Sequence, residues 1–143
     1  MAEEVAGSSH HFKVVQLPYN LAMPEAYFFP NQTVEGESVT LLEAAARLGI
    51  TVFASASLLQ GQVARGLPGE LRELFGAGLE TDAQCALQFV RSTPGVTTAL
   101  VGMKHVEHVE ENLRLVAMPP APADSYRRLL THSAARSELE GST

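Results

Sequence analysis

The chain has 143 residues, 45% of them hydrophobic, and a formal net charge of −6 at pH 7. This length suits one domain, and the composition excludes a disordered or fibrous protein, while the acidic balance disfavours a nucleic-acid or anionic-membrane surface. No membrane span and no secretory leader are recognisable, and the single cysteine, Cys85, cannot form an internal disulfide, so we expect a cytoplasmic protein in which Cys85 is a small core residue.

The first third of the chain predicts a lead-in, a strand and a loop. Residues 1–11 are acidic and then polar without periodicity, which predicts a disordered or frayed lead-in. The apolar residues of FKVVQLP (12–18) predict a short buried strand that Pro18 ends. Residues 22–37 hold two prolines and three aromatic residues without periodicity, which predicts a long loop of the kind that often carries function.

The next segment predicts a capped helix and a second strand. Thr40 and Glu43 have the T-x-x-E spacing of a capping box, and the apolar face behind them ends at Gly49, which can close the helix in the left-handed conformation. The following stretch, ITVFASAS (50–57), is apolar and ends in small residues. We therefore predict that a strand follows the helix directly.

The second half of the chain repeats this alternation. A glycine-rich connection over 58–80 leads to a second capping box at Thr81 and Gln84, and the helix that it opens ends before Pro94. VTTALVG (96–102) predicts the third strand. A helix follows in which apolar residues repeat at helical spacing: Val106, Val109, Leu113 and Val116. A final amphipathic helix begins near residue 123 and fades into a polar tail over 136–143.

The order strand, helix, strand, helix, strand, helix, helix predicts an α/β fold. Apolar strands joined by crossover helices indicate a parallel sheet buried on both faces. Two architectures fit this order: an open α/β sheet, and a piece of a (β/α)8 barrel. In both, ligands bind beyond the carboxyl ends of the strands, which places a site at residues 16–20, 55–61 and 102–105.

The stretch TTALVGMKHVEHVEENL (97–113) predicts an anion site at that edge. A strand that ends at Gly102 leads into the N-terminus of a helix, where backbone N–H groups converge. Lys104, one of only two lysines in the chain, lies between the two elements. His105 and His108 have a spacing that can serve a metal, but no third ligand is evident, so we expect no metal site.

Three motifs resemble the aldo-keto reductase family. VVQLPYNL, AAARLGITVFASASLLQGQ and TDAQCALQFVRSTPGVTTALVGMKHVEHVEENL are similar, in this order, to the segments from the family's sixth strand to its eighth helix. The resemblance runs from about residue 12 to residue 115. It implies the C-terminal half of a (β/α)8 TIM barrel, with three parallel strands and crossover helices, in a domain over 12–135.

The family reduces aldehydes and ketones with NADPH, so the resemblance implies a cofactor site. It assigns Gln16 to the nicotinamide carboxamide and Ser55 to the position that stacks on the nicotinamide ring. Ala56, Ser57 and Leu58 would cover the pyrophosphate, and Gly102, Met103 and Lys104 would hold the adenosine 2′-phosphate. His108, Glu111 and Asn112 would contact the adenine end. Lys104 beside a helix N-terminus gives NADP(H) a modest preference over NAD(H).

The family's catalytic Asp, Tyr, Lys and His belong to its first four strands, which have no counterpart here. We therefore expect no catalytic residue in this chain, and no turnover of a carbonyl substrate until the missing N-terminal half-barrel, or a second copy of the chain, completes it. An alternative of another class is a non-enzymatic nucleotide-binding or interaction module built from a half-barrel. A flavodoxin-like domain is less favoured, because LPYNLAMPEA offers no glycine to a phosphate.

Overall fold

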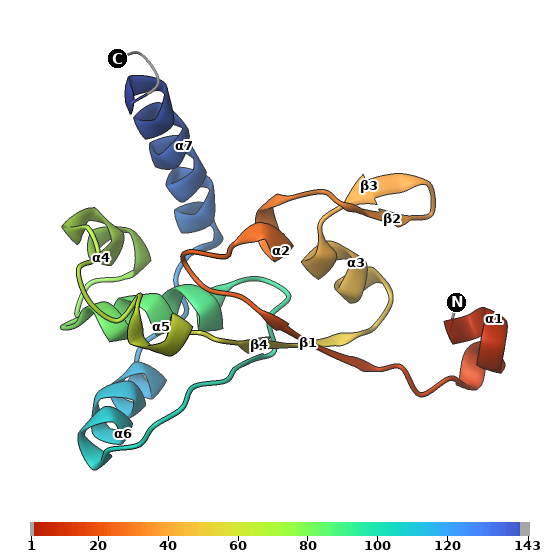
Figure 1. The fold of residues 1–143 in the computed structure, drawn as a ribbon, viewed down its shortest axis with the longest axis horizontal. Helices are drawn as coiled ribbons and strands as arrows, with labels where there is room; N and C mark the ends of the chain where they lie inside the picture. Colours follow the sequence, from red (N-terminus) through yellow and green to blue (C-terminus); the bar gives the residue numbers. More distant parts are fainter. Residues whose placement is uncertain (1, 141–143) are drawn as a thin grey trace.

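The computed structural model describes residues 2–140, apart from the side chains of residue 3 and residues 132–140. The elements in chain order are α1 (Ala2–Ala6), η1 (Gly7–Ser9), β1 (Val14–Pro18), α2 (Glu25–Phe28), β2 (Gln32–Val34), β3 (Glu37–Val39), α3 (Leu41–Arg47), β4 (Thr51–Ser55), η2 (Leu59–Gly61), α4 (Gly69–Phe75), α5 (Asp82–Ser92), β5 (Thr98–Ala99), α6 (Val106–Leu113), η3 (Arg114–Ala117) and α7 (Ala123–Glu140). Figure 1 shows β1 and β4 side by side at the centre, with α1 standing apart from the body.

A three-stranded parallel sheet in the order β1-β4-β5 organises the fold. Helices α3 and α5 cover one of its faces, where Val52 and Ala54 of β4 are fully buried. On the opposite face, Val14 is 49% exposed, Gln16 is exposed and Phe53 is half-exposed, and no described element covers them. The prediction that the strands are buried on both faces is therefore wrong. Their apolar residues suit burial on both faces, but within residues 2–140 only one face has a partner.

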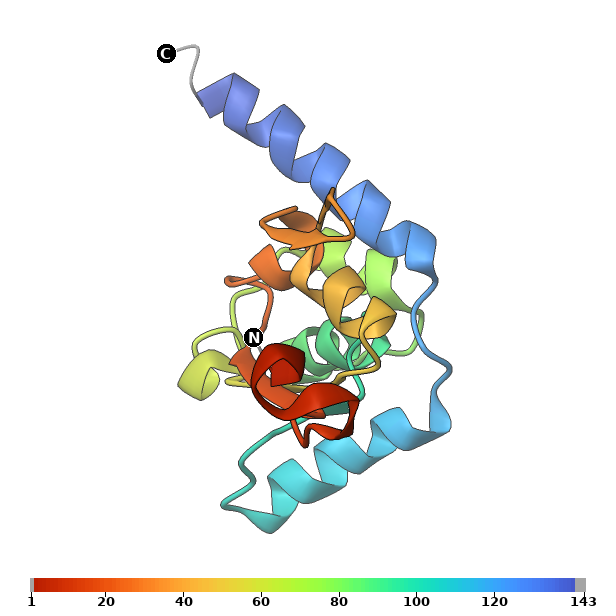
Figure 2. The ribbon, with the colours of Figure 1, turned by 90° about the vertical axis from the view of Figure 1, so that its right-hand side faces the viewer.

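An aromatic cluster joins the elements behind the covered face. Phe89 of α5 stacks on Tyr19, which follows β1, with ring centroids 5.3 Å apart. The rings of Phe75 in α4 and Tyr126 in α7 also contact the Phe89 ring, with centroids 5.4 and 5.5 Å from it. The Tyr126 hydroxyl donates a hydrogen bond of 2.6 Å to the Phe89 carbonyl. This cluster fixes α7 at its first turn, from which the helix extends beyond the body (Figure 2).

The predicted helix ends agree with the structure where they depend on local chemistry. Thr40 and Glu43 form a complete capping box, and Gly49 has a φ of 64° after α3. Thr81 caps α5 by accepting a hydrogen bond from the Gln84 backbone. The reciprocal half of this second box is absent, because the Gln84 side chain accepts from the Glu80 backbone N–H instead.

Several segments predicted as irregular contain regular structure. The loop predicted over 22–37 contains α2 and most of a hairpin of β2 and β3, whose turn is made by Glu35 and Gly36 at φ of 53° and 83°. Two successive positive φ angles are typical of a tight hairpin turn. The connection over 58–80 contains η2 and α4, and the predicted lead-in over 1–11 contains the exposed α1 and η1.

The outermost strand and the termini also differ from the expectation. Of the strand predicted over 96–102, only Thr98 and Ala99 pair with β4. Helix α7 continues to Glu140, into the segment predicted as a polar tail over 136–143, and residues 141–143 lie outside the described residues. The domain boundary at residue 135 stays a prediction. Across residues 2–140, no helix is both long enough and apolar enough to cross a bilayer.

Candidate functional site

A pocket of about 880 Å³ lies beyond the carboxyl ends of β4 and β5. Ligand pockets in proteins typically have volumes of ~300–1,000 Å³. Four segments line it: the loop after β4, the first turn of α5, the loop after β5 with the start of α6, and the last turn of α6. The lining residues are Ala56, Ser57, Leu58, Gln60, Gly61, Ala64, Arg65, Ala83, Leu100, Val101, Gly102, Lys104, His105, His108, Glu111 and Asn112. The pocket thus occupies the edge at which the sequence predicted a site.

The loop after β4 has an unusual backbone. Ala56, Leu59 and Gln60 have positive φ angles of 52°, 45° and 53°, a region that costs a residue with a side chain about 1–2 kcal/mol. Such strain in natural proteins concentrates at functional sites. Asn20 holds the loop by donating to the Ala56 carbonyl at 3.0 Å, and Ser57 does so by donating to the Leu100 carbonyl at 2.8 Å.

These contacts leave polar backbone groups available to a ligand. The Ser57 hydroxyl is used within the protein, but the backbone N–H groups of Ser57 and Leu58 donate to no acceptor among the groups that the structure describes. At the other side of the pocket, His105 is the N-cap of α6 and makes no side-chain capping bond. Free N–H groups at a loop and at a helix N-terminus both favour an anion.

Cationic side chains gather at this pocket although the chain is acidic overall. Lys104 and Arg65 line it from opposite loops, and both are exposed. Neither forms an ion pair among the described residues. The rings of His105 and His108 meet edge to face, with centroids 5.3 Å apart. Among the side chains that the structure describes, no group of three or more His, Cys, Asp or Glu could hold a metal ion.

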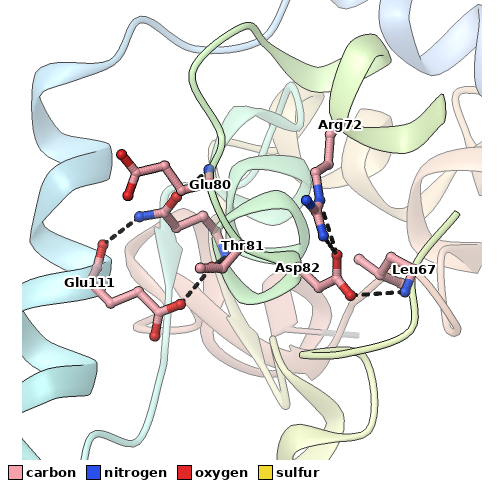
Figure 3. Close-up of polar contacts among 7 residues, drawn as sticks. Leu67, Arg72, Glu80, Thr81, Asp82 and Glu111 are labelled. Carbon is pink, nitrogen blue, oxygen red and sulfur yellow. Dashed lines mark hydrogen bonds and ion pairs between the residues drawn. The ribbon is translucent and has the colours of Figure 1, made fainter. Parts of the chain in front are cut away.

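Helix α6 forms the far wall and is held to α5 by hydrogen bonds, seen in Figure 3. The Thr81 hydroxyl donates to the Glu111 carboxylate, and the Gln84 side chain donates to the Glu111 carbonyl at 3.0 Å. Gln84 is only 1% exposed. We call Thr81, Gln84 and Glu111 the α5–α6 polar contact. Glu111, predicted to bind a cofactor, therefore also positions the helix.

Asn112 supplies an unpaired polar atom beside the pocket. Its Oδ1 is buried and has no hydrogen-bond donor within the described part of the chain. A buried acceptor without a partner costs about 1–3 kcal/mol, so such atoms in native proteins usually have a ligand or water as partner. Asn112 is one of the lining residues. Its amide oxygen thus lies at the pocket wall without an N–H donor from the described part of the chain.

A second set of polar contacts lies at the N-terminus of α5, around Asp82 (Figure 3). Its carboxylate accepts two hydrogen bonds from the Arg72 guanidinium and one of 3.0 Å from the Leu67 backbone N–H. The Arg72 side chain, and then the Leu67 N–H, hold the pKa of Asp82 below its usual value against the opposing effect of burial. Asp82 thus fixes the end of the loop that carries Arg65.

Replacing Asp82 by asparagine is expected to lower the free energy of unfolding by about 1 kcal/mol at pH 7. Because the folded pKa lies below the unfolded one, this stabilisation is present above about pH 4 and is lost as the pH falls through the folded pKa. Urea unfolding between pH 7 and pH 2.5 should show the two proteins converging in acid. Glu80→Gln, at an exposed pair with Arg114, is the control and should change stability by less than ~0.5 kcal/mol. A difference between D82N and the wild type that does not change with pH would contradict this account.

The structure brings most of the predicted site residues to one pocket. Ala56, Ser57, Leu58, Gly102, Lys104, His108, Glu111 and Asn112 line it. Gln16, Ser55 and Met103 do not. Gln16 and Ser55 lie on the uncovered face of the sheet, where Gln16 pairs in register with Phe53, and Met103 is 43% exposed. The roles assigned to these residues stay predictions.

Sequence reasoning missed Arg65 and the loop around it. The segment was predicted as a connection because of its glycines, and Arg65 belongs to no repeating pattern. The usable signal was its position, eight residues after the end of the predicted strand 50–57 and so near the carboxyl edge of the sheet. The structure also places Tyr19 and Tyr126 in the core, where burial raises the pKa of both hydroxyls.

Comparisons with known proteins support the fold. No protein-family model matches the chain, and none of the curated proteins matches it. Among solved structures, it is similar to the aldo-keto reductase AKR11C1 from Bacillus halodurans in its holo form, at 16% sequence identity and a TM-score of 0.58. The match covers 86% of this chain and 43% of that reductase, so the chain spans less than half of that protein's length.

At this identity the likeness shows the fold alone. The chain has an α/β fold with three parallel strands and crossover helices, and it corresponds to part of an aldo-keto reductase barrel. The predicted fold class, the C-terminal half of a TIM barrel, is confirmed.

Proposed function

We propose that this chain is the cofactor-binding half of an aldo-keto reductase-type oxidoreductase, and that the pocket receives the adenosine end of NADP(H). One observation carries the proposal: uncompensated cations, free backbone N–H groups and an unpaired buried acceptor converge on one pocket at the carboxyl edge of the sheet. A molecule with a purine and several phosphates matches this set of groups.

Each group has a distinct role in this proposal. Lys104 is a point charge for the 2′-phosphate, and it accounts for a preference of NADP(H) over NAD(H). Arg65, on the facing loop, and the N–H groups of Ser57 and Leu58 bind the pyrophosphate. The Asn112 Oδ1 accepts a hydrogen bond from the adenine amino group.

The nicotinamide end extends over the uncovered face of the sheet in this proposal. There Gln16 binds the carboxamide, and Ser55 lies where an aromatic residue would stack on the ring. When bound, the cofactor supplies a hydride to a carbonyl carbon. The carbonyl oxygen then needs a proton from an acidic group, and the two core tyrosines cannot supply it, since burial keeps their hydroxyls protonated and away from the face.

Fragment titration tests the site without the missing half of a barrel. We expect adenosine 2′,5′-bisphosphate to bind about tenfold more tightly than AMP in isothermal titration calorimetry, a difference of about 1.4 kcal/mol. Lys104→Ala should remove this difference. Lys13→Ala is the matched control, because it changes the only other lysine and lies before β1, away from the pocket. If neither fragment binds, or if K13A and K104A behave alike, the proposal is wrong.

A second candidate function is a nucleotide-binding module without catalysis. The observation that favours it is that the cations, the free N–H groups and the unpaired acceptor all lie within this one chain, at a pocket that its own loops form. The two functions separate in one assay: NADPH oxidation with a reactive aldehyde, by the chain alone and with an N-terminal half-barrel added. Turnover only after addition supports the reductase half, whereas tight NADPH binding with no turnover in either case supports the module.

A further inference from the structure

Helix α6 and η3, the 3-10 turn that continues it, present apolar residues to solvent. Val106, Leu113 and Val116 are 69%, 59% and 77% exposed, although their spacing predicted a buried face. The cause is the α5–α6 polar contact, which uses Thr81, Gln84 and Glu111 to join the helices. The apolar side of α6 is left without a partner among the described residues. We call these three residues the α6 stripe.

The three-stranded sheet has two open edges, because β1 and β5 each pair on one side only. Lys13 accepts a hydrogen bond from the Thr51 N–H, and Tyr19 donates one to the Ser55 carbonyl. The backbone groups of the odd-numbered β1 residues between them therefore face β4 as well. The backbone groups of Val14 and Gln16 therefore point to the open edge, where Pro18 has no N–H to offer. At the other end, β5 pairs only with β4. Between the two edges lies the uncovered face of the sheet.

These features specify the occupant. One partner that covers the open sheet face, both strand edges and the α6 stripe needs strands to pair with the edges. It also needs helices to pack against the stripe. A TIM barrel has eight strands and this sheet has three, so closure needs five more, and two copies of this chain would reach only six. The chain also matches only 43% of the Bacillus halodurans reductase, whose remaining length exceeds that of a second copy of the matched part. Both arguments favour a different polypeptide segment over a homodimer.

We propose that the open sheet face and the α6 stripe together bind a (β/α)5 unit, whose first strand pairs with β5 and whose fifth strand pairs with β1. The outer helices of that unit pack on the α6 stripe, and its strands close the barrel interior over Val14 and Phe53. The inference rests on the barrel of the proposed function but not on its nucleotide. The surface needs no bound ligand to form.

Co-expression tests the surface with a defined probe, the first five strand–helix units of the Bacillus halodurans reductase. Full-length chain and probe should purify together and sediment as a 1:1 complex without nucleotide. The amides of Val14 and Gln16 should then exchange with deuterium at least a hundredfold more slowly than in the chain alone, because they gain strand partners. Edge pairing predicts this slowing, whereas a nonspecific hydrophobic contact does not.

Matched substitutions locate the contact. Val14→Asp on the sheet and Val116→Asp on the α6 stripe should each weaken the complex at least tenfold. Val5→Asp on α1, where the side chain is 87% exposed, should leave it unchanged. A wild-type chain that forms no complex, or variants that all bind alike, would overturn the proposal. A stable dimer of the chain alone that V14D dissociates would assign the surface to a second copy and also overturn it. Failure of the fragment titration would leave these measurements unaffected.

Discussion

Replacing Phe89 by alanine is expected to lower the free energy of unfolding by about 4 kcal/mol. The side chain is fully buried, and its ring lies within 5.5 Å, centroid to centroid, of Tyr19, Phe75 and Tyr126. These partners come from the end of β1, from α4 and from α7. The cavity left by the ring therefore loosens three elements at once, and little relaxation can fill it. Urea unfolding followed by circular dichroism measures the loss.

Phe89→Leu is the control for shape, since it keeps an apolar side chain and should cost about 1–2 kcal/mol. Because domains of this size have a total stability of ~5–15 kcal/mol, F89A should keep only a small part of it and unfold at a clearly lower urea concentration than F89L. A loss below about 1.5 kcal/mol for F89A would show that the aromatic cluster is not the core of the protein.

Replacing Gln84 by methionine is expected to cost about 2–3 kcal/mol. The substitution keeps the length of the side chain but removes the acceptor for the Glu80 N–H and the donor to the Glu111 carbonyl. Since Gln84 is almost fully buried, water replaces these partners poorly. Helix α6 should be released first, so its amides should lose hydrogen-exchange protection while those of α5 keep theirs.

The exposed Gln62 provides the matched control, because Gln62→Met removes no hydrogen bond made by a described side chain. It should change the free energy of unfolding by less than ~0.5 kcal/mol. If Q84M and Q62M have equal stability, or if α5 and α6 lose protection together in Q84M, then the α5–α6 polar contact does not hold the wall of the pocket.

Sequence reasoning succeeded where the determining chemistry is local. Thr40 and Gly49 mark the ends of α3 because a capping hydroxyl and a left-handed residue act within a few positions of the backbone that they serve. The order of strands and crossovers follows from the same kind of signal. The hairpin at Glu35 and Gly36 was missed because the turn residues were not recognised between short, mostly exposed strands.

The candidate site was predictable in position and less so in detail. The carboxyl edges of parallel strands meet wherever the fold is right, which brought Lys104, His108 and Asn112 together. Arg65 was missed because no periodicity marks a side chain on an irregular loop. The exposure of Val14 and the α6 stripe was also unpredictable. An apolar pattern indicates that a residue suits burial, but it does not identify the segment or partner that buries it.

Pro18, at the open edge of β1, affects how readily the protein aggregates at high concentration. An unpaired strand edge is a template for fibril growth, and proteins usually interrupt such edges. Pro18 removes one donor from the end of that row, and the sheet's other edge is only two residues long. A strand from another molecule would therefore gain few hydrogen bonds at either edge. Aggregation through strand pairing is disfavoured, although the apolar side chains of β1 are retained.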